Sequence, residues 1–176
     1  MRLKITKQLL ESFLKELGAA ATSEGRCFLT GGATAVMYGW RDSTIDVDVK
    51  FEPEPDGVFS AIPGLKDRLK VNVELASPDQ FIPPIQDWQE KSKFIATYGL
   101  ISFYHYNFVA QALAKLERGH KQDITDVKMM LIHKLITTKQ ILEGLEQIRS
   151  GLIRYPAISA DAFVAFVEEF AEHVQV

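Results

Sequence analysis

Apolar and polar residues alternate most regularly in the middle of the chain. From position 44 to position 51 every second residue is apolar, and the residues between them are polar or charged. A period of two over this length predicts a β-strand with one core-facing side and one polar side. The run 71–75 alternates in the same way, so we expect a second strand with Val73 and Leu75 toward the core and Glu74 on the polar side. The core-facing residues expected in the first strand are Ile45, Val47, Val49 and Phe51.

The residues before these strands show the spacing of apolar positions that is typical of a helix. Apolar residues recur three and four apart over 9–17, which predicts an amphipathic helix that ends at Gly18. The run 26–30 indicates a short buried strand, and it leads through two glycines into a predicted helix at 33–38. Two short helices are expected within 58–69, one on each side of a Pro-Gly pair.

The second half of the chain is expected to turn from strands to helices. Prolines and polar residues over 77–90 predict an extended surface loop, and two strands are expected at 93–98 and 100–106. Helical periodicity continues from there to the end. The expected helices are 108–118, a long one from about 125 past 148, and a last one capped by Ser159.

This order of elements predicts an α/β (α+β) fold, in which a mixed sheet is flanked by helices. We expect a core at 1–106 and a C-terminal helical annex at 107–176, packed together as a single compact unit. A length of 176 residues suits that size. With 47% hydrophobic and 24% charged residues, the chain has enough apolar side chains for a buried core and does not have the composition of a disordered protein.

Net charge and cysteine content limit the binding partners and the cellular compartment that we expect. The formal net charge of −3 argues against a broad electrostatic grip on nucleic acid. The one cysteine, Cys27, lies in an apolar run and is expected to be a buried thiol, which favours a reducing compartment. No apolar run approaches the roughly 20 residues that cross a bilayer. We therefore expect a soluble, cytoplasmic protein without a membrane partner.

The candidate chemistry begins with Asp46 and Asp48, whose carboxylates project from one strand face about 6–7 Å apart. Two like charges at that spacing repel unless a cation lies between them, and Mg²⁺ or Mn²⁺ prefers such oxygen ligands. If the two alternating strands are neighbours, Glu74 joins the pair, as a third metal ligand or as the base that accepts a proton from an acceptor hydroxyl. The alternative is that the aspartates form only the solvated face of an edge strand.

A glycine pair at a strand-to-helix turn adds a second feature. Gly31 and Gly32 leave backbone amides bare at a helix N-terminus, where phosphate groups bind. A tight turn without a ligand is the alternative for such a pair. Thr34 adds a hydroxyl to this site, or else it has a capping or surface role.

Together, the runs 29–36 and 41–49 resemble the signature of the polymerase-β-type nucleotidyltransferase superfamily, in which a glycine pair precedes Asp-x-Asp on the next strand. Their form looks most like the AbiEii-like minimal nucleotidyltransferases of bacterial toxin–antitoxin systems. The resemblance implies a nucleotidyltransferase fold, and roles for residues that match the motif in order. It implies that Gly31 and Gly32 cradle a triphosphate, that Asp46 and Asp48 bind metal, and that Glu74 is the third acid. Arg41 and Ser43 match the residues before the aspartate pair; Arg41 contacts phosphate or is a surface residue.

The resemblance continues to residue 127. Such proteins carry a helical lysine followed by a closely spaced aspartate pair, here Lys115, then Asp123 and Asp126. It implies that Lys115 reaches a phosphate and that Asp126 orients it, the alternative being a solvated helix lysine. Gln122 stands where a basic residue is usual.

The resemblance predicts a metal-dependent nucleotidyltransferase that uses an NTP with Mg²⁺ or Mn²⁺. The acceptors that it implies are a tRNA 3′ end, a protein or a small molecule, and a cognate antitoxin is the implied partner. Two alternatives remain open. The first is a non-catalytic nucleotide-binding or partner-binding protein on the same fold, and the second is an interaction domain that carries the pattern by coincidence.

Overall fold

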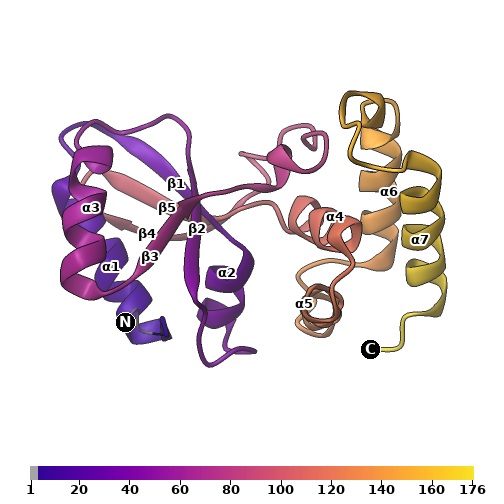
Figure 1. The fold of residues 1–176 in the computed structure, drawn as a ribbon, viewed down its shortest axis with the longest axis horizontal. Coiled ribbons are helices and arrows are strands. Elements are labelled where there is room, and N and C mark those ends of the chain that lie inside the picture. The colour runs from indigo at the N-terminus through magenta and orange to yellow at the C-terminus, as the bar shows by residue number, and fades with distance from the viewer. Residues whose placement is uncertain (1–3) are drawn as a thin grey trace. The chain divides into compact units, whose positions relative to one another are not determined.

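The computed structural model describes residues 4–176, and their contacts divide the chain into two compact units. The first unit comprises the described residues up to 77 together with 92–106, and it contains the strands. The second comprises 78–91 and 107–176 and is helical (Figure 1). The expected fold class, a mixed sheet with flanking helices, is confirmed. The packing of the helical region onto the strand-containing unit stays a prediction.

The sheet has five strands in the described part of the chain, in the order β3-β2-β1-β5-β4. The strands are β1 (Gly25–Thr30), β2 (Asp46–Phe51), β3 (Asn72–Leu75), β4 (Lys93–Tyr98) and β5 (Ile101–His105). β1 pairs antiparallel with β2 and parallel with β5, while β2 pairs parallel with β3 and β4 pairs antiparallel with β5. The two strands that carry the candidate acids are therefore neighbours.

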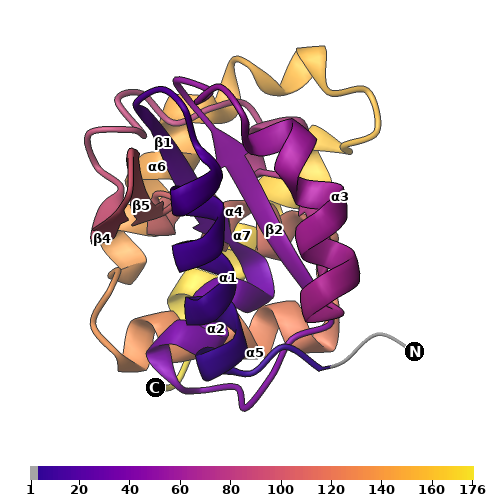
Figure 2. The same cartoon turned by 90° about the vertical axis from the view of Figure 1, so that its left-hand side faces the viewer.

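One face of the sheet is covered by α1 (Lys7–Ala20) and α3 (Val58–Leu69), which lie side by side against it (Figure 2). The alternation along β2 places Val47 and Val49 in the core beneath these helices, as predicted. The opposite face carries the polar residues of the same strands. The buried side chains that α1 and α3 contribute are Leu10, Phe13, Leu14, Leu17, Val58 and Leu65.

Two residues at the ends of the strands were predicted to face the core, and this prediction is wrong. Ile45 precedes the first residue of β2 and is 69% exposed, and Leu75 is the last residue of the edge strand β3 and is 54% exposed. Neither side chain therefore reaches the core, although each has the correct parity. The alternation predicts on which face of the sheet a residue lies, but it does not predict whether a helix packs over that residue.

Two helices continue past residues that were expected to stop them. Gly18 lies inside α1, where a Cβ would meet the Tyr98 backbone carbonyl, so glycine serves here to let the helix approach the β4–β5 hairpin. Pro63 lies inside α3, which is one helix rather than two. Val58 and Leu65 are buried on either side of Pro63, so packing against α1 compensates for the backbone hydrogen bond that proline removes.

The second unit is built around α4 (Phe108–Arg118). This helix packs against each of the three helices that follow it in the chain. Asn107 caps α4 by accepting a hydrogen bond from the Ala110 amide at 2.9 Å. The other helices are α5 (Lys121–Ile132), α6 (Thr138–Arg149) and α7 (Ala160–His173), with short 3-10 turns at Pro78–Gln80 and Leu152–Arg154. Ser159 precedes α7 as expected, but its side chain makes no capping hydrogen bond. Within residues 4–176, no helix combines the length and apolar character that a bilayer crossing requires.

Two predictions for this region are wrong. The long helix is broken into α5 and α6, because Lys134 adopts a left-handed conformation and Thr137 forms a capping box with Gln140 that starts a new helix. The segment 78–91 is not an extended surface loop, since Ile82, Ile85 and other apolar side chains of this segment are buried. Prolines lie between these apolar residues, so the sequence pattern indicated a surface loop rather than a buried segment.

Candidate functional site

The three candidate acids lie on one face of two neighbouring strands. The parallel register pairs Asp46 with Asn72 and Asp48 with Glu74, so all four side chains project to the side opposite the α1–α3 core. Neighbouring strands are about 4.8 Å apart, and residues two apart on a strand are about 6.7 Å apart. The backbone therefore brings Asp46, Asp48 and Glu74 within mutual side-chain reach.

Asn72 fills the space between two of these acids. Its side-chain amide donates to Asp46 Oδ1 at 2.6 Å and to Glu74 Oε1 at 3.1 Å. The carboxylate of Asp48 turns instead toward the glycine pair, since a Cβ on Gly31 would lie 2.7 Å from Asp48 Oδ2. Across residues 4–176, no three histidine, cysteine, aspartate or glutamate side chains form a group positioned to hold one metal ion. The acids thus share a face without converging on a common point.

The glycine pair forms the first turn of α2 (Gly31–Tyr38), directly after β1. Thr30 occupies the N-cap position but makes no side-chain capping bond. Arg41 follows α2, and its Nη1 lies 3.5 Å from where a Cβ on Gly32 would be. The guanidinium group is therefore close to the helix N-terminus, where backbone amides and the helix dipole favour an anion.

Thr44 closes the other side of this turn. Its Oγ1 donates to the Asp46 carbonyl at 3.1 Å and lies against Gly32, where any side chain would collide with it. An isolated antiparallel bridge to Ile5 holds the Thr44 backbone, with N–O distances of 2.8 and 3.0 Å. The loop 39–45, which includes the half-buried Ser43, is thereby anchored next to the start of β2.

Replacing Gly31 with alanine is expected to destabilise the protein by about 1–2 kcal/mol, because Gly31 has φ of +61° and its Cβ would press on Asp48. Gly64 in α3 provides a matched control, since a Cβ there meets nothing within 4 Å and alanine favours a helix. Urea unfolding should show a loss for Gly31→Ala and no loss for Gly64→Ala. Equal behaviour of the two variants would contradict this account of the turn.

The hydroxyl of Thr34 contacts His105 and the Leu29 carbonyl. Thr34 is fully buried, and its hydroxyl lies 3.1 Å from His105 Nδ1 and donates to the Leu29 carbonyl at 3.5 Å. His105 also packs against the ring of Tyr38, with centroids 4.9 Å apart. Thr34 and Tyr38 thus tie α2 to the end of β5 and fix the direction of the helix whose N-terminus forms the turn.

Burial, and after it the positive charge of Lys93, its partner in the β4–β5 register, together lower the pKa of His105 to about 4. The unfolded chain takes up this proton near pH 6.5 and the folded protein only near pH 4. The free energy of unfolding should therefore be highest above pH 6.5 and fall by up to roughly 3 kcal/mol as the pH drops toward 4. Urea titrations of wild type and His105→Asn should diverge over this range, and parallel pH profiles would contradict the assignment.

Lys115 and Asp126 belong to a buried ion cluster in the helical unit. Lys115 Nζ lies 2.7 Å from Asp126 Oδ2 and 3.4 Å from Asp123 Oδ1. Arg118 reaches the same Asp123 oxygen at 2.6 Å, and Gln122 donates to Asp126 Oδ1 at 3.4 Å. Asp126 therefore holds Lys115 in place, while Asp123 forms ion pairs with the side chains of Lys115 and Arg118. The contact between Lys115 and a phosphate stays a prediction.

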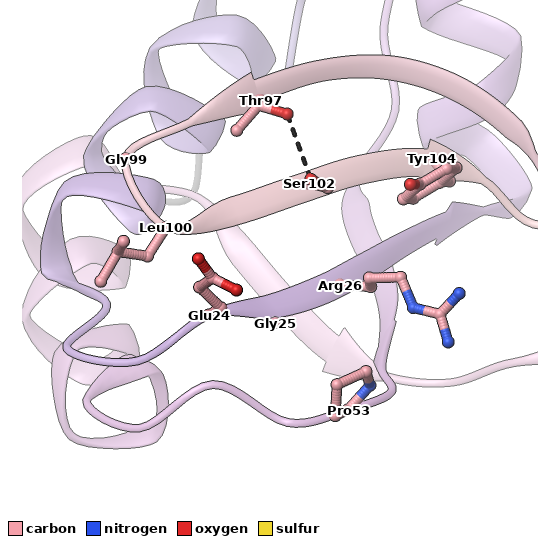
Figure 3. A pocket seen from close by; sticks show the side chains of 9 residues that line it. All are labelled: Glu24, Gly25, Arg26, Pro53, Thr97, Gly99, Leu100, Ser102 and Tyr104. Atoms are coloured by element: carbon pink, nitrogen blue, oxygen red, sulfur yellow. Dashed lines mark hydrogen bonds between the residues drawn. The ribbon is translucent and has the colours of Figure 1, made fainter.

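A separate pocket of about 390 Å³ lies at the other end of the sheet, around the start of β1 and the β4–β5 hairpin (Figure 3). Arg26 in this pocket and Thr30 beside Asp48 are four residues apart on β1, about 13 Å at the usual strand rise. The pocket contains none of the predicted site residues. Its lining is Glu24, Gly25, Arg26, Pro53, Thr97, Gly99, Leu100, Ser102 and Tyr104.

No family model, curated protein or solved structure matches the chain. The resemblance to nucleotidyltransferases therefore depends on the motif residues themselves and on their arrangement.

Two residues of the site were not predicted. Asn72 was assigned only to the polar side of its strand, although an asparagine two positions before Glu74 on the same face signals an amide beside the acids. Thr44 was placed on the polar face of β2, yet it belongs to the preceding loop and packs on Gly32. No local pattern predicts that contact, because it joins residues twelve positions apart.

The residue types match the oxygen ligands that a hard divalent cation prefers, but their side chains do not converge on one point in the described part of the chain. Three carboxylates share this face, Asp48 lies against the glycine turn, and the Asn72 amide donates to the other two. Asp46, Asp48 and Glu74 are the residues that would hold the ion.

Proposed function

We propose that this chain is a metal-dependent nucleotidyltransferase, which transfers a nucleotidyl group from an NTP to an acceptor. The observation that carries the proposal is the placement of Asp46, Asp48 and Glu74 on one face of β2 and β3, with Asp48 against Gly31 of the glycine turn. The turn supplies amides for the triphosphate and the acids supply ligands for its counter-ion.

The proposed reaction needs no covalent bond between the protein and the substrate. An acceptor hydroxyl attacks the α-phosphorus, the bond from that phosphorus to the α,β-bridging oxygen breaks, and pyrophosphate leaves. The hydroxyl proton passes to a carboxylate, for which Glu74 is the candidate because it is exposed on the acid face. Arg41 and the first amides of α2 offset the negative charge of the triphosphate. A Mg²⁺ or Mn²⁺ ion, when bound, neutralises charge on the phosphates and orients them.

The acceptor and partner are proposed only as classes. The resemblance implies a tRNA 3′ end, a protein or a small molecule as acceptor, and an antitoxin protein as partner. The formal charge of −3 favours an acceptor that does not require a long basic track.

The test is transfer of label from α-³²P NTPs to acceptors in the presence of Mg²⁺ or Mn²⁺. Total tRNA, a soluble protein extract and an aminoglycoside panel represent the three acceptor classes. We expect label on one of them with wild type, and none with an Asp46→Asn/Asp48→Asn double variant. Equal labelling by the two proteins, or none by either across the four NTPs, would contradict the proposal.

A non-catalytic nucleotide-binding protein is the second candidate. It is favoured by the Asn72 amide, which satisfies Asp46 and Glu74 without a metal ion. Calorimetry separates the two, because binding of an NTP with equal affinity in EDTA and in Mg²⁺, without turnover, would support the second candidate and not the first.

A further inference from the structure

The pocket at the start of β1 lies on the same sheet face as the three acids, but at the opposite end of the strands (Figure 3). Arg26 and Ser102 in this pocket alternate with the core residues Cys27 and Phe103, which places them on the face away from α1 and α3. The volume of about 390 Å³ falls within the range of small-molecule sites. The pocket is therefore a second cavity, and its own side chains determine what it can bind.

Arg26 provides a fixed positive charge in this pocket. Its Nε donates to the Glu52 carbonyl at 3.0 Å, and its guanidinium carbon lies 5.6 Å from the centre of the Phe28 ring. The Glu52 carboxylate instead lies 3.6 Å from Lys50 Nζ. In the described part of the chain, no carboxylate forms an ion pair with Arg26. Its two terminal nitrogens are therefore available to a ligand carboxylate, which a guanidinium binds through two parallel hydrogen bonds.

Glu24 provides a negative charge at the other end of the pocket. Its side chain is exposed, and it forms no ion pair within residues 4–176. It lies beside Leu100 at the hairpin turn, whereas the Arg26 side chain extends toward Phe28 (Figure 3). Residues two apart on a strand are separated by about 6.7 Å, and these two side chains extend in opposite directions, so their charges are farther apart than that.

Two hydroxyl groups line the stretch between these charges (Figure 3). Ser102 is the partner of Arg26 in the β1–β5 register, and Thr97 is the partner of Ser102 on β4. The two hydroxyls lie 3.1 Å apart and share one hydrogen bond, which leaves the second hydroxyl hydrogen and further lone pairs for a ligand. A peptide group has the matching N–H donor and C=O acceptor.

We propose that this pocket binds a short zwitterionic peptide of two or three residues, with its terminal carboxylate on Arg26 and its terminal ammonium group on Glu24. An extended residue spans at most about 3.6 Å, so a single α-amino acid does not reach both charges, whereas two residues span about 7 Å. A phosphate dianion is disfavoured, because Glu24 repels it. The inference does not depend on the proposed function.

A set of small probes tests length and charge separately. Protein-observed NMR of the full chain at constant ionic strength, near pH 6.5 where both peptide termini are charged, gives the affinity for each probe. We expect dialanine to bind at least about tenfold more tightly than alanine, N-acetyl-dialanine or dialanine amide, because alanine is too short and the other two each lack one charge.

Variants assign the two charges to their side chains. Glu24→Gln at its exposed position should bind dialanine and N-acetyl-dialanine equally, because the partner of the ammonium group is gone. Arg26→Gln should bind dialanine at least about tenfold more weakly than wild type. Arg154→Gln, an exposed arginine outside the pocket, is the matched control and should bind it like wild type. Should Arg26→Gln fail to fold in thermal unfolding, the result for Glu24→Gln decides.

Three outcomes would overturn the proposal. The first is that dialanine does not bind, and the second is that it binds no more tightly than alanine or acetate, which indicates a simple anion site. The third is that Glu24→Gln prefers dialanine over N-acetyl-dialanine as strongly as wild type does, which removes Glu24 as the ammonium partner. Each outcome is measured without nucleotide, so none of them decides whether the chain transfers nucleotidyl groups.

Discussion

Replacing Asp48 with asparagine is expected to lower the rate of nucleotidyl transfer by about a thousandfold or more, without loss of stability. The substitution preserves size but removes a charge that, under the proposed function, would hold the counter-ion of the triphosphate, and such electrostatic contributions are worth several kcal/mol. Asp48 is half-buried, lies opposite Glu74 in the β2–β3 register and packs against Gly31.

The stability of the folded protein should change little. Asparagine has the size and shape of aspartate and Asp48 is only half-buried, so the melting temperature of Asp48→Asn should stay close to that of wild type. Label transfer from α-³²P NTP and thermal unfolding measured on the same preparation test both halves. Asp67→Asn, an exposed acid on α3, should change neither. A stable Asp48→Asn variant with wild-type activity would remove this residue from the site.

Replacing Lys115 with methionine should produce the largest loss of stability, about 3–5 kcal/mol. Lys115 is 5% exposed, and its ammonium group is shared by Asp126, which is fully buried, and Asp123, which is 3% exposed. Methionine keeps the volume but removes the ammonium group that lies 2.7 Å from Asp126 Oδ2, and the hydrogen bond from Gln122 to Asp126 is longer, at 3.4 Å. An uncompensated charge in the interior is the physical cause of the loss.

Denaturant unfolding of three variants tests this reading of the cluster. Lys128→Met on the exposed side of α5 is the matched control and should lie within about 0.5 kcal/mol of wild type. The double variant Lys115→Met/Asp126→Leu should recover much of the loss, because it removes the buried charge together with its partner. A Lys115→Met protein as stable as wild type would contradict the buried ion cluster.

The sequence predicted the parts of the fold that local patterns determine. The alternation around Asp46 and Asp48 correctly placed Val47 and Val49 in the core and both acids on the opposite face. It also placed Glu74 on the polar side of a second strand, and the structure makes that strand a neighbour of the first. The side of a strand follows from a period of two, whereas pairing partners depend on the whole chain.

The rest depended on contacts between distant residues. Gly18 looks like a helix stop until Tyr98 is found against it, and Pro63 looks like a break until α3 is seen to pack on α1. Asn72 belongs to the site only because β3 pairs with β2 in a register that sets it opposite Asp46. By contrast, the break before α6 was readable, since Thr137 and Gln140 have the spacing of a capping box.

The central claim is that acids on β2 and β3 hold a divalent ion beside the Gly31–Gly32 turn, together with a triphosphate. A crystal structure with Mn²⁺ and a non-hydrolysable NTP analogue, recorded at the manganese absorption edge, tests it most directly. We predict an anomalous peak about 2.2 Å from carboxylate oxygens of Asp46 and Asp48, with the phosphates against the first turn of α2. Ordered nucleotide bound elsewhere, or manganese absent from this face while the nucleotide is present, would contradict the account.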